Sequence, residues 1–198
     1  MKYRWFLLFF IIFIVSNLHA QNFADFFVNK TLRIDYLLTG DANSQQICLD
    51  ELSVLPQWAG RRHHLNELPL KGNGQVIVSD SLTGKQIYAN SFSSLFTEWL
   101  STGEAKTVAK GFEHTVLIPY PIRTVKVDVT LCNNYGKEVA RLTHLVNPKD
   151  ILIHAKGLTN ITPYKYIVHS GSYTDCIDVA ILGEGYTRLE MKTFYADA

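Results

Sequence analysis

The sequence predicts a mostly β protein, an antiparallel β-sandwich with one short helix, followed by the first strand and helix of a truncated α/β domain. Six or more short apolar segments follow one another from about Phe23 to Asn147, and most are joined by hairpin turns. Only one segment in this range has helical periodicity. After it, an apolar run, a Gly-Glu-Gly turn and a capped helix at the end of the chain indicate the start of an α/β unit.

Residues 1–20 have the features of a secretory signal peptide. Lys2 and Arg4 form a basic start, Trp5 to Val15 is uninterrupted and apolar, and a short polar run ends at Ala20. This apolar run is shorter than the roughly 20 residues that a membrane-spanning helix needs. We therefore expect cleavage of residues 1–20 and an exported mature protein, either periplasmic or secreted.

The charge balance argues against two classes of partner. Without the signal peptide, 17 basic residues face 18 acidic ones, which gives a net charge of −1. Nucleic acids and anionic membranes attract basic surfaces, so we expect neither as a partner after signal removal. The three cysteines are odd in number, widely spaced and set in apolar contexts, which predicts buried free thiols: Cys48, Cys132 and Cys176.

The first strands are predicted from alternation. In Thr31–Leu38 every second side chain is apolar, and Ile47–Val54 is a second run that Pro56 closes. An irregular loop, 58–64, then carries one large aromatic anchor, Trp58. A hairpin follows in 75–89, with its turn at Asp80–Gly84.

A short amphipathic helix is predicted after this hairpin, with Ser91 as N-cap and Gly103 just past its end. Its apolar stripe consists of Phe92, Leu95, Phe96, Trp99 and Leu100.

The last part of the sandwich contains the clearest hairpin. Pro119 and Pro121 end a strand at a sheet edge or a bend, and 125–131 and 139–146 then alternate around an Asn133–Gly136 turn. His144 shares the apolar face of the return strand, which favours a hydrogen-bonded core or rim histidine over a metal ligand. Residues 148–175 are predicted as a linker because they are rich in turn residues.

The end of the chain predicts a buried strand and a helix. Ile177–Leu182 is nearly all apolar, and after Gly185 the pair Thr187 and Glu190 has the spacing of a capping box. Because a first strand and helix cannot complete an α/β domain, we interpret the chain as a fragment that ends just inside a second domain.

No catalytic or metal-ligating constellation is evident. The Gly183-Glu-Gly185 turn lacks the third glycine of a dinucleotide site, and there is no serine in a Gly-x-Ser-x-Gly elbow. His63, His64 and Glu67 offer no apparent fourth ligand, and adjacent histidines on an extended segment point in opposite directions. We therefore assign no catalytic residue, no metal ligand and no cofactor to this chain.

One loop is a candidate for docking. Guanidinium groups bind carboxylates in a bidentate manner, so Arg61 and Arg62, anchored by Trp58, could hold a neighbouring domain or an acidic stretch of substrate. The alternative interpretation is an exposed loop without a partner.

Four stretches resemble a known family. "LPQWAGRRHHL", "FSSLFTEWLSTGEAK", "DILIHAKG" and "CIDVAILGEGYTRLEMKTFYADA" are similar to the N-terminal part of the M64 family of secreted zinc peptidases, the IgA peptidases. The resemblance implies a β-rich N-terminal domain before a zinc-dependent catalytic domain with a His-Glu-x-x-His helix. That motif is absent from these 198 residues, so we expect this chain to be inactive as a peptidase. Zinc is expected in the missing catalytic domain.

The resulting domain organisation is a signal peptide (1–20), an N-terminal β-sandwich domain (21–147), a linker (148–175) and the start of the truncated peptidase domain (176–198). Two hypotheses stay open. The chain is either the accessory domain of an exported M64-like zinc endopeptidase, or a stand-alone exported binding module for carbohydrate or protein. In the first case its partners are its own C-terminal catalytic domain and the protein substrate.

Overall fold

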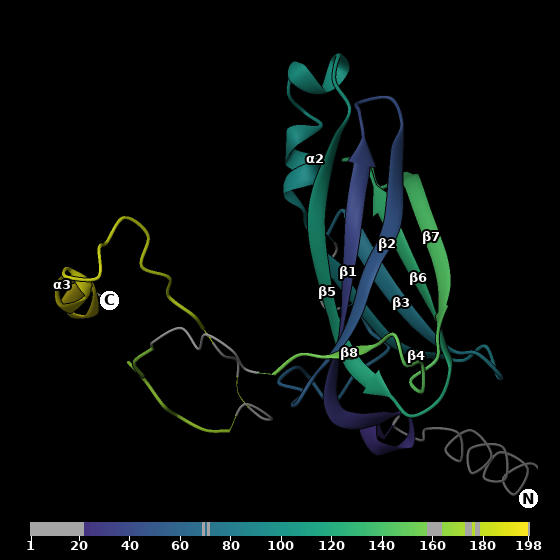
Figure 1. Ribbon diagram of the computed structural model, residues 1–198, viewed down its shortest axis with the longest axis horizontal. Helices are drawn as coiled ribbons and strands as arrows, with labels where there is room; N and C mark the ends of the chain where they lie inside the picture. Colours follow the sequence, from purple (N-terminus) through teal and green to yellow (C-terminus); the bar gives the residue numbers. More distant parts are fainter. Residues whose placement is uncertain are drawn as a thin grey trace, which may run out of the picture.

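A computed structural model of the chain describes residues 22–68, 70, 72–157, 164–172, 176 and 179–197. The predicted signal peptide, residues 1–20, lies outside these described residues. Strands of the described part form two four-stranded sheets that pack face to face (Figure 1). Sheet A has the strand order β5-β1-β2-β8, and sheet B has the order β4-β3-β6-β7. The predicted β-sandwich is confirmed.

The predicted strands and hairpins are present, most of them longer than the sequence pattern indicates. The strands are β1 (Phe27–Gly40), β2 (Gln45–Leu55), β3 (Gly74–Asp80), β4 (Gln86–Phe92), β5 (Lys110–Pro121), β6 (Val125–Cys132), β7 (Glu138–Val146) and β8 (His154–Ala155). The helical elements are η1 (Phe23–Asp25), α2 (Leu95–Trp99), η2 (Glu104–Lys106) and α3 (Met191–Asp197). Of the strands, β8 is the one that the sequence did not predict. It lies within the predicted linker and pairs in parallel with β2.

The core lies between the inward faces of the two sheets, where the alternation of the sequence predicts it. On β1, every second side chain from Leu32 to Leu38 is at most 1% exposed. On β6, Val125, Val127 and Val129 are fully buried against them. Burial of these alternating rows from both sheets supplies the main stabilisation of the sandwich.

Tyr36 and His144 join the two sheets by a polar contact inside this core. The Tyr36 hydroxyl on β1 lies 2.8 Å from Nε2 of His144 on β7, and the two rings meet edge to face. Burial raises the pKa of Tyr36, and it lowers the pKa of His144 against smaller opposing effects of the Leu145 backbone and Asp128. The interpretation of His144 as a hydrogen-bonded core or rim histidine is confirmed.

The helix after β4 begins later than the sequence predicts. Phe92 pairs with Gly74 in the β3-β4 ladder, so the strand continues through the position where we expected the helix to start. Ser94, rather than Ser91, is the N-cap, and its hydroxyl accepts a hydrogen bond from the Thr97 N–H at 3.2 Å. Leu95 is 72% exposed and lies outside the core, so its assignment to the apolar stripe is wrong.

Pro119 and Pro121 lie at the end of β5, and Pro121 is its last residue, so the strand ends there as predicted. The sheet position explains this, since β5 is an edge strand of sheet A, where a missing N–H is tolerated. A register shift in β1 between Val28 and Thr31 lies opposite these prolines.

The predicted strand 177–182 is not formed in its described part, residues 179–182. Val179 is 82% exposed and Leu182 85% exposed, because no neighbouring strand in the described chain pairs with them. The helix after this segment exists as α3, and Figure 1 shows it apart from the sandwich. Only half of the predicted capping box forms. The Glu190 carboxylate accepts from the Thr187 N–H at 2.8 Å, but the Thr187 hydroxyl contacts this same carboxylate.

The three cysteines are free thiols, yet their predicted burial is wrong. Cys48 and Cys176 are exposed, and Cys132 is intermediate. Cys48 faces outward because its neighbour Ile47 occupies the inward position on β2. Within the described residues, no helix has both the length and the apolar character that a membrane span requires.

We predict that two inward histidines make the sandwich sensitive to mild acid. Burial lowers the pKa of His114 as well as that of His144, so both resist protonation in the folded state. The unfolded chain therefore binds more protons than the folded chain below about pH 6.5. The contribution of the two histidines to the free energy of unfolding is at its maximum above this pH, and it is lost as the pH falls towards their pKa values in the folded state.

Urea unfolding at pH 7.5 and pH 5.5 should show a lower midpoint at the acidic pH. The double variant His114→Phe, His144→Gln should lose most of this difference, with exposed His63→Gln as the control. An undiminished pH difference in the double variant would contradict the assignment.

Candidate functional site

Trp58 anchors the loop that follows β2. Its side chain is only 5% exposed, and its ring meets Tyr88 of β4 edge to face, with the centroids 6.1 Å apart. The indole N–H donates to the carbonyl of Arg61 at 3.0 Å, which folds the loop back on itself. A Cβ atom at Gly60 would lie 2.3 Å from the indole, so only glycine fits beside this ring.

Arg61 is engaged by the sandwich itself. Its guanidinium donates to the carbonyls of Leu65 at 3.3 Å, Glu67 at 2.7 Å and Ala89 of β4. The group also lies over the Tyr88 ring, 5.4 Å from the centroid. In addition, the Ala89 N–H donates to the Leu65 carbonyl at 2.7 Å. The loop thus forms hydrogen bonds with the backbone at the outer edge of β4, and Arg61 makes most of the contacts that hold the loop there.

Arg62 has fewer internal contacts. Its guanidinium contacts the Asn29 side chain at 2.5 Å and lies 4.9 Å from the centroid of the Phe23 ring. Its Nε is buried without a hydrogen-bond partner. No ion pair joins Arg62 to a carboxylate of the described residues. Of the two predicted docking arginines, Arg62 therefore has the greater remaining capacity to bind a carboxylate.

The histidines of this loop point to solvent. His63 and His64 are exposed, and His64 Nδ1 lies 2.9 Å from the Glu67 carboxylate. In the described ranges, no group of three or more His, Cys, Asp or Glu side chains is arranged to hold a metal ion. The residues described do not fit a zinc site, so we derive no metal chemistry for them.

A cleft of about 380 Å³ lies between this loop and the edges of the two sheets. Its volume is within the range of small-ligand sites, roughly 300–1,000 Å³. The guanidinium beside it is already bonded to backbone carbonyls, so the cleft offers mainly apolar surface and the amide of Asn90. It is lined by Thr31, Trp58, Ala59, Gly60, Arg61, Tyr88, Asn90 and Leu117.

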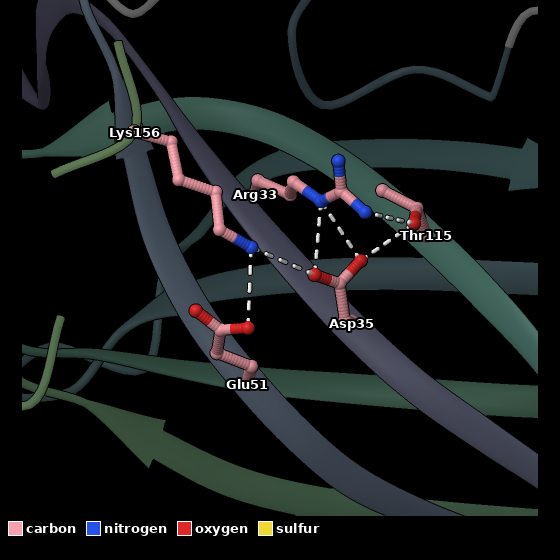
Figure 2. Close-up of polar contacts among 5 residues, drawn as sticks. All are labelled: Arg33, Asp35, Glu51, Thr115 and Lys156. Carbon is pink, nitrogen blue, oxygen red and sulfur yellow. Dashed lines mark hydrogen bonds and ion pairs between the residues drawn. The ribbon is translucent and has the colours of Figure 1, made fainter. Parts of the chain in front are cut away.

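A charged cluster lies on the outer face of sheet A (Figure 2). Arg33 Nε lies 2.9 Å from both oxygens of Asp35, and the Thr115 hydroxyl donates to the same carboxylate at 2.5 Å. Lys156 Nζ lies 3.1 Å from Glu51 and 3.8 Å from Asp35. Burial raises the pKa of Asp35, but the hydrogen bonds and the positive charges of Arg33 and Lys156 outweigh this effect and hold the pKa below its usual value.

Sequence reasoning missed this cluster. Alternation places Arg33 and Asp35 on the outer face of β1, but their partners come from strands far away along the chain. Lys156 gives no local signal, because it follows a two-residue strand inside a stretch rich in turn residues.

Comparison with known protein families shows which family the chain belongs to. A sequence model described as Peptidase M64 N-terminus matches residues 22–143, from the residue before η1 into β7. The chain belongs to this family. The resemblance that the sequence suggested is confirmed, and the sandwich is the accessory N-terminal domain of the M64 peptidase family. A search of curated proteins finds no match to the chain.

We predict that the two arginines differ in their effect on stability. Arg61→Ala leaves backbone carbonyls at the β4 edge without their charged donor, which should cost about 2 kcal/mol of unfolding free energy. Arg62→Ala removes one amide contact and one cation–π contact, with Asn29 and Phe23, and should cost about 1 kcal/mol or less. Trp58→Ala should cost about 3 kcal/mol or more, since it empties a buried site.

Urea unfolding of the three variants measures these differences. Arg61→Lys should recover only part of the loss, because Nη2 makes all three bonds and lies one bond further along the side chain than a lysine Nζ. Equal losses for Arg61→Ala and Arg62→Ala would contradict the distinction between them.

Proposed function

We propose that this chain is the N-terminal accessory domain of an exported zinc endopeptidase of the M64 type, and that it docks against its own C-terminal catalytic domain. The observation that carries the proposal is the family match, which covers nearly the whole sandwich. In this proposal the chain contributes no catalytic group. Its role is to hold the catalytic domain in place and to present the protein substrate.

The position of the docking loop supports this role. The loop begins where β2 ends, and Val54 near this end of β2 pairs with Ala155 of β8. The loop and the exit of the chain therefore lie at the same end of the sandwich. A domain connected through residue 157 would lie within reach of Arg62.

A stand-alone exported binding module is the second candidate. The cleft beside Trp58 favours it, because a concave, largely apolar site with one amide suits a carbohydrate or an apolar peptide side chain. In that case no catalytic domain is required.

Reading the gene past Ala198 separates the two candidates. We expect an open frame with a His-Glu-x-x-His motif, peptidase activity of the longer protein that a zinc chelator abolishes, and no activity of the present chain. A stop codon directly after Ala198, with stable production of this chain, would overturn the proposal and support the binding module.

Arg62 is expected to contribute to docking in the longer protein. Arg62→Ala should weaken the contact between the domains, since breaking a buried pair of a guanidinium and a carboxylate costs about 3–5 kcal/mol. The matched control is Lys137→Ala, which removes the same charge from the β6-β7 turn at the other end of the sandwich.

Thermal unfolding of the longer protein and of this chain, with each variant, gives the comparison. The expected result is a large shift of the longer protein for Arg62→Ala alone. Equal small shifts in both proteins would show that Arg62 belongs to an ordinary solvated loop.

A further inference from the structure

Sheet A carries an acidic site on its outer face, at the level of Asp35. Cross-strand pairing brings Asp35 of β1 beside Glu51 of β2 and Thr115 of β5. The Asp35 side chain is only 15% exposed, so its charge is poorly solvated. Within the strands, Arg33 is the cation that faces this site, and it also interacts with Glu51 and Glu113. One guanidinium faces three carboxylates, so the site attracts a second cation.

Lys156 supplies that second cation from the segment that leaves the sandwich. Its ammonium lies 3.1 Å from Glu51 and 3.8 Å from Asp35, and Figure 2 shows it in contact with both carboxylates. Its backbone N–H donates to the Val54 carbonyl at 3.0 Å. Side chain and backbone thus fix the same residue to sheet A.

The segment before Lys156 is also attached. The Tyr120 hydroxyl of β5 donates to the Pro148 carbonyl at 2.7 Å, and Ile153 packs against the core. The connection from β7 to the edge of sheet A is therefore attached to the sandwich at several residues. Lys156 is the last attached residue before residue 157, and β8 itself contributes only two residues to the sheet.

We infer that Lys156 acts as a reversible latch, which closes on the site formed by Asp35 and Glu51 and so sets the direction in which the chain leaves the sandwich. The closed state depends on charge, because the side chain of Lys156 is 37% exposed and that of Glu51 is 40% exposed, and pairs this exposed are weak and screened by salt. When the latch opens, β8 loses its main side-chain support, and its pairing with β2 opens more often.

The latch has a consequence for the enzyme that rests on the proposed function. A catalytic domain attached beyond residue 157 would have one preferred orientation while the latch is closed, and a wider range of orientations when it is open. The latch itself needs only residues of the sandwich and the exit segment.

Hydrogen exchange of the backbone amides tests the latch in the chain as it stands. Lys156→Met keeps an apolar stem of similar length but removes the charge, and we expect amides 154–156 to exchange about two- to fivefold faster, the effect of losing an exposed ion pair. Lys149→Met is the control, because this exposed lysine precedes β8 on the same connection and forms no ion pair among the described residues. Amides 116–118 in β5 should be unchanged in both variants.

Two further measurements separate charge from local packing. Glu51→Gln should produce part of the Lys156→Met effect, and 1 M NaCl should accelerate exchange of amides 154–156 in the unaltered chain but not in Lys156→Met. Unchanged exchange in Lys156→Met, or the same acceleration in Lys149→Met, would overturn the latch. These readouts do not involve peptidase activity, so a stop codon after Ala198 would overturn the proposed function and leave the latch standing.

Discussion

The outer edges of the two sheets are the constraint on which the rest of this sandwich depends. Backbone groups at a sheet edge need partners or protection, and two of the four edges here receive different solutions. The loop after β2 bonds to the edge of β4 through Arg61 and Leu65. The exit segment covers the last part of β2 through β8. Both solutions lie at the same end of the sandwich, which explains why the candidate docking loop and the exit of the chain are neighbours.

The sequence predicted those parts of the fold that depend on local patterns. Period-2 alternation identified β1 and the β6-β7 hairpin, because each inward side chain is buried by the same pleated geometry. It placed the helix N-cap at Ser91, since the pattern does not reveal that strand pairing with Gly74 extends β4 through Phe92. It missed β8, because two residues are too few to show a period.

The candidate site was predicted as a group of residues but not in its internal arrangement. Trp58 was expected as an anchor, and its burial against Tyr88 shows why it is one. The two arginines looked equivalent in the sequence. They differ in the structure because the carbonyls that Arg61 bonds to belong to the loop and to β4, up to 28 residues away. Contacts with backbone carbonyls leave no trace in residue types, so the sequence does not reveal this difference.

The close contact between Gly60 and Trp58 links the residues of the segment Trp58-Ala-Gly-Arg61, so that a change at one position affects what is tolerated at the others. Glycine is needed at 60 only while an indole lies against it, and Arg61 is positioned by the hydrogen bond from that indole. Natural variants of this domain should therefore keep or lose these positions together. Where Trp58 is replaced, residues other than glycine fit at position 60. Substitutions at positions 58 and 60 should therefore covary among related sequences.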